Sequence, residues 1–545
     1  MNDQLSVDLP GWTPEADTAL SQLIEQRAAS RMYAKDATLW GPDAEQEAGS
    51  RLGWTDCHTV SRPLLAEIDA LRADLAGEGV DHVVLCGMGG SSLAPEVITT
   101  SAGVDLTVLD STDPGMVGRA LTDRLDRTVV VVSSKSGSTV ETDSQRRAFL
   151  GAFEQAGIDG SQRIVVVTDP GSPMSDLATA AGYRRVFHAD PNVGGRYSAL
   201  TAFGLVPSGL AGADIATLLD DAEAVVADLA RDDEANPALQ LAALLTTAHD
   251  AGSEKLVLGE GNIDDVAGLP AWAEQLVAES TGKLGRGILP VDVEEAVSSS
   301  VGWQDPADTI TRAAIGTDPS GDAHVVTDGS LGGLFQFWES AIALTGIGLG
   351  INPFDQPNVE EAKNAARALL DAPQGSGDET APSFTDGSVQ VFADPAFLGD
   401  ATDLAGVLAA AREAVPPGGY LAVMAYLDRT GADAEAAGLR SALGGDQPFQ
   451  VTFGWGPRFL HSTGQYHKGG HPNGAFLQVT GAIAEDLEVP GRPYTFGSLI
   501  TAQAAGDLAV LADKGFPTVR LHLTDRAAGL RQLLAAASAP SLSRR

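Results

Sequence analysis

The sequence predicts an α/β protein built from doubly wound parallel sheets. Four short apolar runs in the first third of the chain are separated by helical stretches: Val83–Gly87, Leu106–Asp110, Val129–Ser134 and Arg163–Asp169. These runs are continuously apolar rather than alternating, which is typical of strands that are buried on both faces of a sheet. Strands of this kind, alternating with helices, indicate a parallel sheet that helices cover on both sides.

The chain is long enough to form several units. It has 545 residues, and a single core rarely grows beyond about 250–300 residues. We expect a helical lead-in over residues 1–60, a first α/β unit over 61–235 and a second over 236–372. Residues 373–545 are predicted to form an additional C-terminal α/β region. Within the lead-in, Asp17–Met32 has a helix-forming composition.

The elements of the two units follow from composition and periodicity. Ser61–Leu75 has apolar residues at helical spacing and begins with Ser-Arg-Pro, which is typical of a helix start. Residues 209–251 also have a helical pattern. For the second unit we expect one strand and three helices, at Lys255–Gly261, then Trp272–Gly282, Leu331–Thr345 and Val359–Leu370.

A break in composition precedes the C-terminal region. Asp371–Ser388 is rich in Gly, Pro, Ser and acidic residues, which predicts a linker or an exposed loop. Beyond it the chain again has an α/β pattern. We expect strands at Val389–Asp394, Tyr420–Leu427, Phe449–Gly454 and Thr518–Thr524.

The composition argues against several classes of protein. The formal net charge of −38 disfavours nucleic-acid binding, which needs a surplus of Lys and Arg. No apolar run reaches the roughly 18 residues of a membrane helix, and the first residues lack the pattern of a secretory signal. Two cysteines, Cys57 and Cys86, cannot make a disulfide framework. We therefore expect a cytoplasmic protein with reduced thiols and no membrane or nucleic-acid partner.

A glycine-rich turn follows the first predicted strand. In LCGMGGSSLAPEV, the backbone N–H groups around Gly90 and Ser91 and the start of the next helix face one point, which is typical of an anion site. A dinucleotide fingerprint needs Gly where Ser92 stands, so NAD is disfavoured. A turn that only connects the two elements also fits this motif.

A second strand ends in a cluster of hydroxyl groups. The stretch VVVVSSKSGSTVET places Ser134, Ser136 and Thr139 at the carboxyl end of its strand, together with Lys135. Ligands of open α/β sheets bind at this edge. Capping and turn chemistry would also explain the hydroxyl groups. The two strand ends together favour a phosphate, which needs such a local site because the net charge repels anions.

Three further segments carry candidate residues. Gln275 and Glu279 are four residues apart and share one helix face, although Glu279 alone also fits a solvated helix acid. The STGK sequence that follows lacks the remaining residues of a P-loop. Arg196 follows a glycine pair, where backbone can approach a ligand closely. HSTGQYHKGGH, at 461–471, contains three histidines, but no cysteine or carboxylate completes a familiar metal-binding spacing.

Taken in order, these motifs resemble the glucose-6-phosphate isomerase family. The stretches are GMGGSSLAP, SSKSGSTVET, GGRYSALTAFGL, EQLVAESTGK and INPFDQPNVEEAK, which lie between Val83 and Lys363 in the family's order. The lead-in and the HSTGQYHKGG tail are similar to the isomerase half of bacterial fused transaldolase/glucose-6-phosphate isomerase proteins. Only about 80 residues precede the first predicted strand, so we expect no transaldolase barrel ahead of it. The resemblance implies two sugar-isomerase (SIS) domains.

The resemblance also implies roles for individual residues. Phosphate contacts are implied for Ser134, Lys135, Ser136 and Thr139. Gly90 and Ser91 would line the sugar, and Gln275 would hold a hydroxyl group. For the chemistry, the resemblance implies Glu279 as the base that moves a proton between C2 and C1 through a cis-enediol, Arg196 as the stabilising charge and Lys363 near the ring oxygen. Neither a metal nor an organic cofactor is implied.

The chain departs from the family at the histidine that helps to open the sugar ring. In the family a Gly-Gln-His segment precedes the FDQ motif, whereas here the nearest likeness follows it by about 100 residues. His467 or His461 is the candidate, supplied from the other subunit of the homodimer that the resemblance implies.

Other functions fit the same motifs. A non-catalytic phosphosugar-binding SIS protein would keep the hydroxyl loop without needing Glu279. An isomerase of broader specificity would act on mannose 6-phosphate as well. The C-terminal region would, in a further alternative, dock another sugar-phosphate enzyme.

Overall fold

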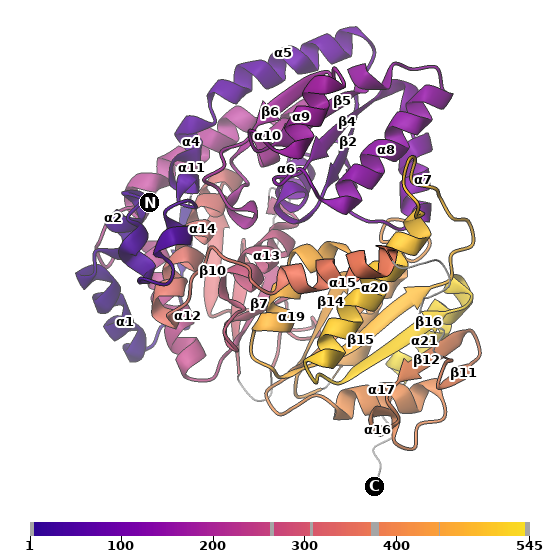
Figure 1. The fold of residues 1–545 in the computed structure, drawn as a ribbon. Coiled ribbons are helices and arrows are strands. Elements are labelled where there is room, and N and C mark those ends of the chain that lie inside the picture. Colours follow the sequence, from indigo (N-terminus) through magenta and orange to yellow (C-terminus); the bar gives the residue numbers. More distant parts are fainter. Residues whose placement is uncertain (1–4, 262–265, 306–308, 372–380, 446, 540–545) are drawn as a thin grey trace.

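The computed structural model describes residues 5–261, 266–305, 309–371, 381–445 and 447–539. Three mostly parallel sheets carry the fold, with helices on their faces (Figure 1). This arrangement confirms the predicted α/β class with two doubly wound units and an additional α/β region. The exact boundaries between the units stay predictions.

The first sheet has the strand order β3-β2-β4-β5-β6, and every neighbouring pair is parallel. Its strands are β2 (His82–Gly87), β3 (Thr107–Leu109), β4 (Thr128–Ser133), β5 (Ile164–Thr168) and β6 (Arg185–His188). The order reverses between β2 and β4, because the chain moves to one side for β3 and then returns. A ligand site is expected at the carboxyl ends of two such strands.

Seven helices belong to this part of the chain within the described residues. They are α5 (Pro63–Gly77), α6 (Leu93–Ser101), α7 (Pro114–Thr122), α8 (Val140–Gln155), α9 (Pro173–Ala180), α10 (Ala202–Ala211) and α11 (Ile215–Leu229). The apolar runs of β2 and β4 are fully buried on both sides, as their lack of alternation predicts.

The second sheet has the order β1-β10-β9-β7-β8. Its parallel strands are β7 (Lys255–Glu260), β8 (Leu289–Glu295), β9 (Ile310–Ile315) and β10 (Val325–Gly329), and β1 (Leu5–Asp8) pairs antiparallel with β10. The helices of this part of the chain are α12 (Pro237–Asp250), α13 (Leu269–Thr281), α14 (Leu331–Leu349) and α15 (Val359–Asp371).

The lead-in differs from its prediction as purely helical. It contributes strand β1 to the second sheet, and the helix expected at Asp17–Met32 is divided into α1 (Pro14–Glu25) and α2 (Ala28–Tyr33). Arg27, between the two helices, has the left-handed backbone conformation with φ of 53°, which ends a right-handed helix. Four short elements complete the lead-in, at Ala37–Trp40, Glu45–Ala48, Gly53–Asp56 and Cys57–Val60.

The C-terminal sheet has the order β11-β12-β16-β15-β13-β14. Its strands are β11 (Phe384–Asp386), β12 (Val389–Ala393), β13 (Tyr420–Tyr426), β14 (Gln450–Trp455), β15 (Gly474–Gly481) and β16 (Thr518–Leu523). As in the second sheet, four parallel strands follow the spatial order second, first, third, fourth, with an antiparallel strand beside the fourth. The C-terminal unit therefore repeats the strand plan of the second unit.

The sequence prediction missed the central strand β15 and placed a linker where β11 forms. The run GAFLQVTG begins directly after a histidine-rich segment and contains Gln478, so its apolar pattern is short. Part of the expected linker, residues 372–380, lies outside the described residues. The helices of this unit are α16 (Pro395–Leu398), α17 (Leu404–Glu413), α18 (Leu439–Gly444), α19 (Gly464–Gly469), α20 (Phe496–Asp513) and α21 (Arg526–Ser538).

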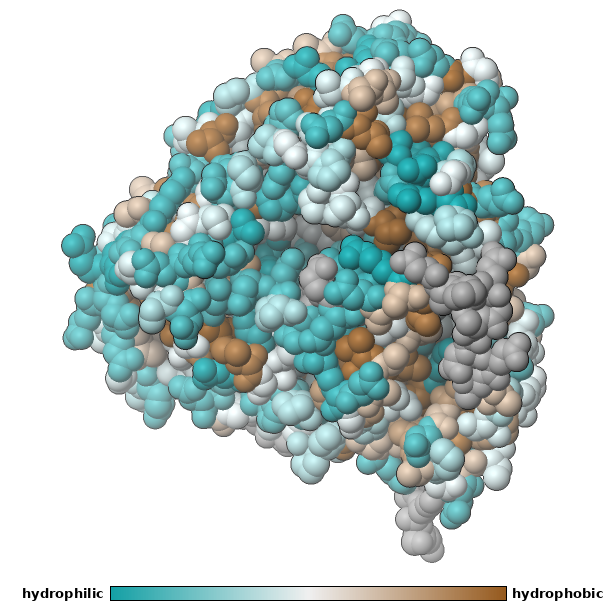
Figure 2. All heavy atoms as spheres, viewed as in Figure 1, coloured by the Kyte–Doolittle hydropathy of each residue, from teal (hydrophilic) through white to brown (hydrophobic). Residues whose placement is uncertain are grey.

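Shared apolar cores join the three units. Val257 of β7 and Ala278 of α13 lie in one buried cluster with Tyr420 and Met424 of β13. The viewed face of the molecule is mainly hydrophilic (Figure 2), as the charge predicts. No helix among the described residues is long and apolar enough to cross a membrane.

Candidate active site

The glycine-rich turn at the end of β2 packs against the segment that carries Arg196. After Gly87 the chain forms a 3₁₀ turn, Gly89–Ser91, and then enters α6. A Cβ atom on Gly90 would lie 1.9 Å from the carbonyl oxygen of Gly195, so only glycine fits. Ser91 is half-buried beside it. The turn therefore serves as a close contact between β2 and the Arg196 segment, in addition to linking two elements.

The hydroxyl loop follows β4, at the neighbouring strand end. The Ser134 and Thr139 hydroxyl oxygens are 2.8 Å apart, and those of Ser136 and Ser138 are 3.0 Å apart. Lys135 is already paired, since its Nζ donates to the Asp169 carboxylate at 2.7 Å. The hydroxyl groups are thus brought together as predicted, whereas the Lys135 charge is directed to a carboxylate.

The hydroxyl loop forms one wall of a pocket of about 350 Å³. Small-ligand pockets start at about 300 Å³, so this one is large enough for a small molecule. Lys363 and Arg367 of α15 form a second wall, and His461 and Gln503 come from the C-terminal unit. The pocket combines hydroxyl donors with two cations, which suits an anionic polar ligand.

A buried carboxylate holds the histidine of this pocket. His461 Nε2 lies 3.2 Å from Glu141 Oε1, and Gln503 Nε2 donates to the same oxygen at 2.7 Å. The side-chain amide oxygen of Gln503 in turn accepts a hydrogen bond from the Thr112 hydroxyl at 2.6 Å. Burial would raise the pKa of Glu141, but the hydrogen bond and charge of His461 outweigh it and the pKa is lowered. Glu141 and Gln503 thus form one buried hydrogen-bonded group with the imidazole.

Glu279 and Arg196 form a buried ion pair beside this pocket. Arg196 Nε lies 2.9 Å from Glu279 Oε2, and the side chains are only 3% and 5% exposed. The guanidinium also donates to the carbonyl oxygens of Glu279, Pro353 and Asp355, at 2.7 to 3.2 Å, and to the Gln356 side chain at 3.0 Å. The interpretation of Glu279 as a solvated helix acid is therefore wrong. Neither residue is among those that line the pocket.

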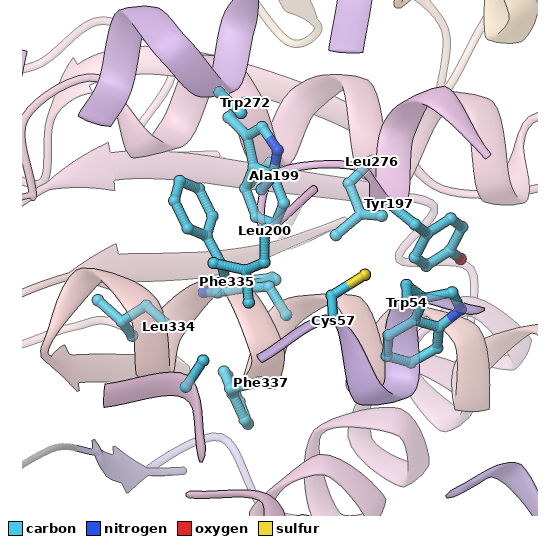
Figure 3. Close-up of a cluster of buried hydrophobic side chains, with 14 of the residues drawn as sticks. Trp54, Cys57, Tyr197, Ala199, Leu200, Trp272, Leu276, Leu334, Phe335 and Phe337 are labelled. Carbon is cyan, nitrogen blue, oxygen red and sulfur yellow. The ribbon is translucent and has the colours of Figure 1, made fainter. Parts of the chain in front are cut away.

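An apolar core fixes the backbone on both sides of this ion pair. Tyr197, next to Arg196, stacks on Trp54 with ring centroids 5.2 Å apart, and its hydroxyl lies 3.1 Å from that of Ser280. Leu276 and Trp272 of α13 lie in the same buried cluster (Figure 3). Because aromatic contacts of this density resist movement, the ion pair has a rigid support.

Gln275 connects the ion pair with the pocket. Its Nε2 donates to the His461 carbonyl oxygen at 2.8 Å, and Glu279 follows one turn later on the same face of α13. The amide oxygen of Gln275 is buried without a hydrogen-bond partner among the described residues. One helix therefore brings the predicted base and the pocket histidine close to each other.

The three histidines of HSTGQYHKGGH lie in different places. His461 faces the pocket, whereas His471 pairs with Glu254 at 2.6 Å. The His467 ring is enclosed by aromatic rings, with centroids 5.3 Å from Phe476 and 6.0 Å from Tyr420. Burial, followed by the charge of Lys468, lowers its pKa to about 3. His461 therefore lines the pocket, whereas His467 does not.

Sequence reasoning missed Glu141 and Gln503 as pocket residues. Glu141 lies in the quoted stretch VVVVSSKSGSTVET, and an acid two residues beyond a hydroxyl loop was a usable signal. Gln503 had none, because its position depends on how α20 packs on the first unit. No group of three or more His, Cys, Asp or Glu that could hold a metal ion occurs within the described ranges.

Comparison with known proteins places these residues in a family context. The family model of phosphoglucose isomerase matches residues 64–309. A probable glucose-6-phosphate isomerase of Haloarcula marismortui is 30% identical over 368 residues, which cover 58% of this chain and 82% of that protein. A hypothetical protein of Thermus thermophilus, solved as a crystal structure, superimposes with a TM-score of 0.56 and 26% identity and covers 68% of this chain and 100% of its own.

Other relatives match over a smaller share of their length. The glucose-6-phosphate isomerase of a Cyanothece species is 27% identical over 353 residues, which are 53% of this chain and 65% of that protein. The chain therefore spans less than two thirds of the length of some curated relatives that it matches.

Proposed function

The chain belongs to the phosphoglucose isomerase family, and from this we propose that it interconverts glucose 6-phosphate and fructose 6-phosphate. One observation carries the proposal: the hydroxyl loop, the His461–Glu141 pair and Lys363 surround one pocket, and Gln275 joins that pocket to the Glu279–Arg196 pair. Such a site provides a place for a phosphate and for both an acid and a base. A cytoplasmic location and a homodimer remain part of the proposal.

The phosphate binds, in this proposal, to the loop that follows β4. Hydroxyl and backbone N–H groups at a strand end favour a phosphate, and Ser136, Ser138 and Thr139 of the loop line the pocket. Ser134 and Lys135 are not among the residues that line it. Gly90 and Ser91 would then line the sugar from the neighbouring strand end. Because the phosphate is remote from C1 and C2, its binding energy serves to position the reacting carbons.

Glu279 acts as the base that moves a proton between C2 and C1. The two carbons are adjacent, so one carboxylate serves both of them through a cis-enediol intermediate. Arg196 is held by several oxygen acceptors and does not lose its proton, so it is a fixed cation for the oxyanion that develops. Gln275 would hold a sugar hydroxyl with its unpartnered amide oxygen.

His461 opens the sugar ring by giving a proton to the ring oxygen, with Lys363 beside it. Both residues line the pocket, and the contact with Glu141 orients the imidazole. His461→Asn is expected to lower kcat for fructose 6-phosphate by about 10²-fold, the lower end for acid–base catalysis. His471→Asn is the matched control, since His471 pairs with Glu254 away from the pocket. Equal rates for the two variants would contradict this role.

Thr139→Val tests the phosphate contact without changing the size of the side chain. A hydrogen bond to a charged group contributes about 1.5–3 kcal/mol, so we expect KM for fructose 6-phosphate to rise at least about tenfold with little change in kcat. Thr142→Val is the control, because the Thr142 hydroxyl is buried without a hydrogen-bond partner among the described residues. A similar KM in both variants would remove Thr139 from the phosphate site.

The proposed function itself is tested with the unmodified protein. Turnover of fructose 6-phosphate in a coupled assay without added metal supports an isomerase. Binding of the sugar phosphate without turnover would instead favour a phosphosugar-binding protein. Adding mannose 6-phosphate as substrate in the same assay tests the broader specificity.

A further inference from the structure

We infer that the C-terminal unit supplies the imidazole of the catalytic centre to its own chain, so that one chain holds a complete centre. The inference rests on the proposed function, and it replaces the expectation that the histidine comes from another subunit. It depends on how the C-terminal unit is fixed on the first unit. Three sets of contacts do this.

The first set is a buried cluster of two acids and two arginines. Glu96 and Asp110 belong to the first unit, and Arg429 and Arg458 to the C-terminal unit. Asp110, which is fully buried, accepts from Arg458 at 2.8 Å and from Arg429 at 3.0 Å. Glu96 pairs with Arg429 at 3.0 Å and also with Arg458. Separating the two units would leave these buried charges unpaired, so opening this interface requires a large free energy.

The cluster lies directly beside the histidine in the sequence. Arg458 and His461 are the first and last residues of one 3₁₀ turn, Arg458–His461. An anchor at Arg458 therefore fixes the backbone of His461 within one turn. The His461 carbonyl is also fixed, since it accepts from Gln275 and lies 2.8 Å from where a Cβ of Gly89 would stand.

The second and third sets join the same two units through other residues. Gln503 of α20 bridges Thr112 and Glu141 of the first unit, and Arg526 of α21 pairs with Asp113 at 2.8 Å. Val489, ahead of α20, and Phe496, the first residue of α20, pack into the apolar core of Phe149 and α8, where the yellow segment reaches the first unit in Figure 1. Ionic, polar and apolar contacts thus all hold the C-terminal unit in the same position on the first unit.

A mixing experiment tests which chain supplies His461. Glu279→Gln and His461→Ala each remove a different catalytic residue, and the two variants are co-expressed with different tags and purified through both. If centres were shared between chains, each mixed dimer would hold one intact centre out of two, and the doubly purified protein would regain roughly half of the wild-type rate. We expect no more than the sum of the two variants. Restored activity would overturn the inference.

A cross-link tests the same point without using activity. A Cβ at Gly151 of α8 would lie 3.3 Å from Cγ of Pro490, so the side chains at these two positions are in contact. A disulfide needs its two Cβ atoms about 3.5–4.5 Å apart. The native thiols, Cys57 and Cys86, are buried and do not compete. After mild oxidation of Gly151→Cys/Pro490→Cys we expect a disulfide within one chain, at monomer mass on a non-reducing gel. A covalent dimer, or no disulfide, would overturn the inference.

The two tests separate this inference from the proposed function. Suppose that the wild-type protein shows no isomerase activity but the cysteine pair forms a disulfide within one chain. The proposed function is then wrong, while the docking of the C-terminal unit on the first unit of its own chain is supported. If the wild type is active and the mixed dimer regains activity, the proposed function is supported, and the inference that each chain supplies its own His461 is wrong.

The ion cluster also predicts how stability depends on pH. Burial alone would raise the pKa of Glu96, but the charges and hydrogen bonds of Arg458 and Arg429 outweigh it and lower the pKa from 4.5 to about 2. Since the folded-state pKa is depressed, the stability from Glu96 is present above about pH 4.5 and is lost as the pH falls towards 2. Glu96→Gln should therefore have a lower Tm than the wild type at pH 7 and a smaller further loss between pH 4.5 and 3, measured by thermal unfolding. Parallel Tm curves would contradict this prediction.

Discussion

Glu279→Gln should reduce the isomerisation rate of fructose 6-phosphate by at least about 10²-fold, the lower end of the contribution of a general base. Glutamine keeps the shape of the side chain and its hydrogen-bonding oxygen, but it cannot accept the C2 proton. The backbone support of the site, from Tyr197 and the α13 core, does not depend on the carboxylate charge. The loss should therefore appear in kcat, with KM changed only a few-fold.

A second measurement makes the Glu279 prediction specific. Exchange of the C2 proton with solvent deuterium reports proton abstraction directly, and it should fall in parallel with kcat. Glu274→Gln is the matched control, because Glu274 lies on the same helix but lines a different pocket. If Glu279→Gln keeps activity within tenfold of the wild type, Glu279 is not the base. If both variants lose activity equally, the loss comes from a disturbance of helix α13 and not from the missing Glu279 carboxylate.

Much of the fold was predictable because its central strands are buried on both faces. In a chain of ordinary composition, a continuous apolar run such as VVVV at Val129–Val132 is typical of a strand buried on both faces of a sheet. The prediction did not include strands β6, β8, β9 and β10. It also missed β1 and β15, for different reasons. β1 is a half-exposed edge strand of four residues, and the pattern of β15 is interrupted by Gln478, whose buried amide donates to Ala504.

The candidate site was only partly predictable, because several of its properties depend on tertiary contacts. The hydroxyl loop and the glycine turn lie at strand ends, so the strand pattern alone placed them side by side. The burial of Glu279 depends on Arg196, which is 83 residues away along the chain. The choice between His461 and His467 depends on which face of the C-terminal unit meets the first unit. No local pattern contains that information.

For Lys135, the sequence motif suggests a contact with a phosphate, whereas in the structure its side chain pairs with a carboxylate. A lysine in the middle of a hydroxyl loop is a natural phosphate partner by composition. Its ammonium group instead lies 2.7 Å from Asp169, at the end of the next strand. The two side chains are 26% and 20% exposed, so the Lys135 ammonium group is still partly accessible to an anion. A role in phosphate binding stays a prediction for Lys135.

Arg196→Ala is expected to lower both the free energy of unfolding and activity, and the two losses have separable causes. Removing one partner of a buried ion pair costs about 3–5 kcal/mol, since it leaves the other charge uncompensated. Here the remaining charge is Glu279, and the carbonyl oxygens of Pro353 and Asp355 lose their donor as well. Urea unfolding should show a loss of this size, whereas Arg185→Ala, which breaks an ion pair with about half of each side chain exposed, should cost less than about 1 kcal/mol.

The Glu279→Gln background separates the charge of the pair from the other contacts of Arg196. With a neutral glutamine at 279, the loss of Arg196 no longer strands a buried carboxylate, so Arg196→Ala should cost less stability there than in the wild type. The difference between the two costs is the coupling energy of the pair, which for contacting residues is about 0.5–3 kcal/mol. Equal costs in both backgrounds would mean that Arg196 stabilises the protein through the carbonyl groups alone. In that case its guanidinium would be held ready for a substrate oxyanion independently of Glu279, and the two catalytic roles would be separate in origin.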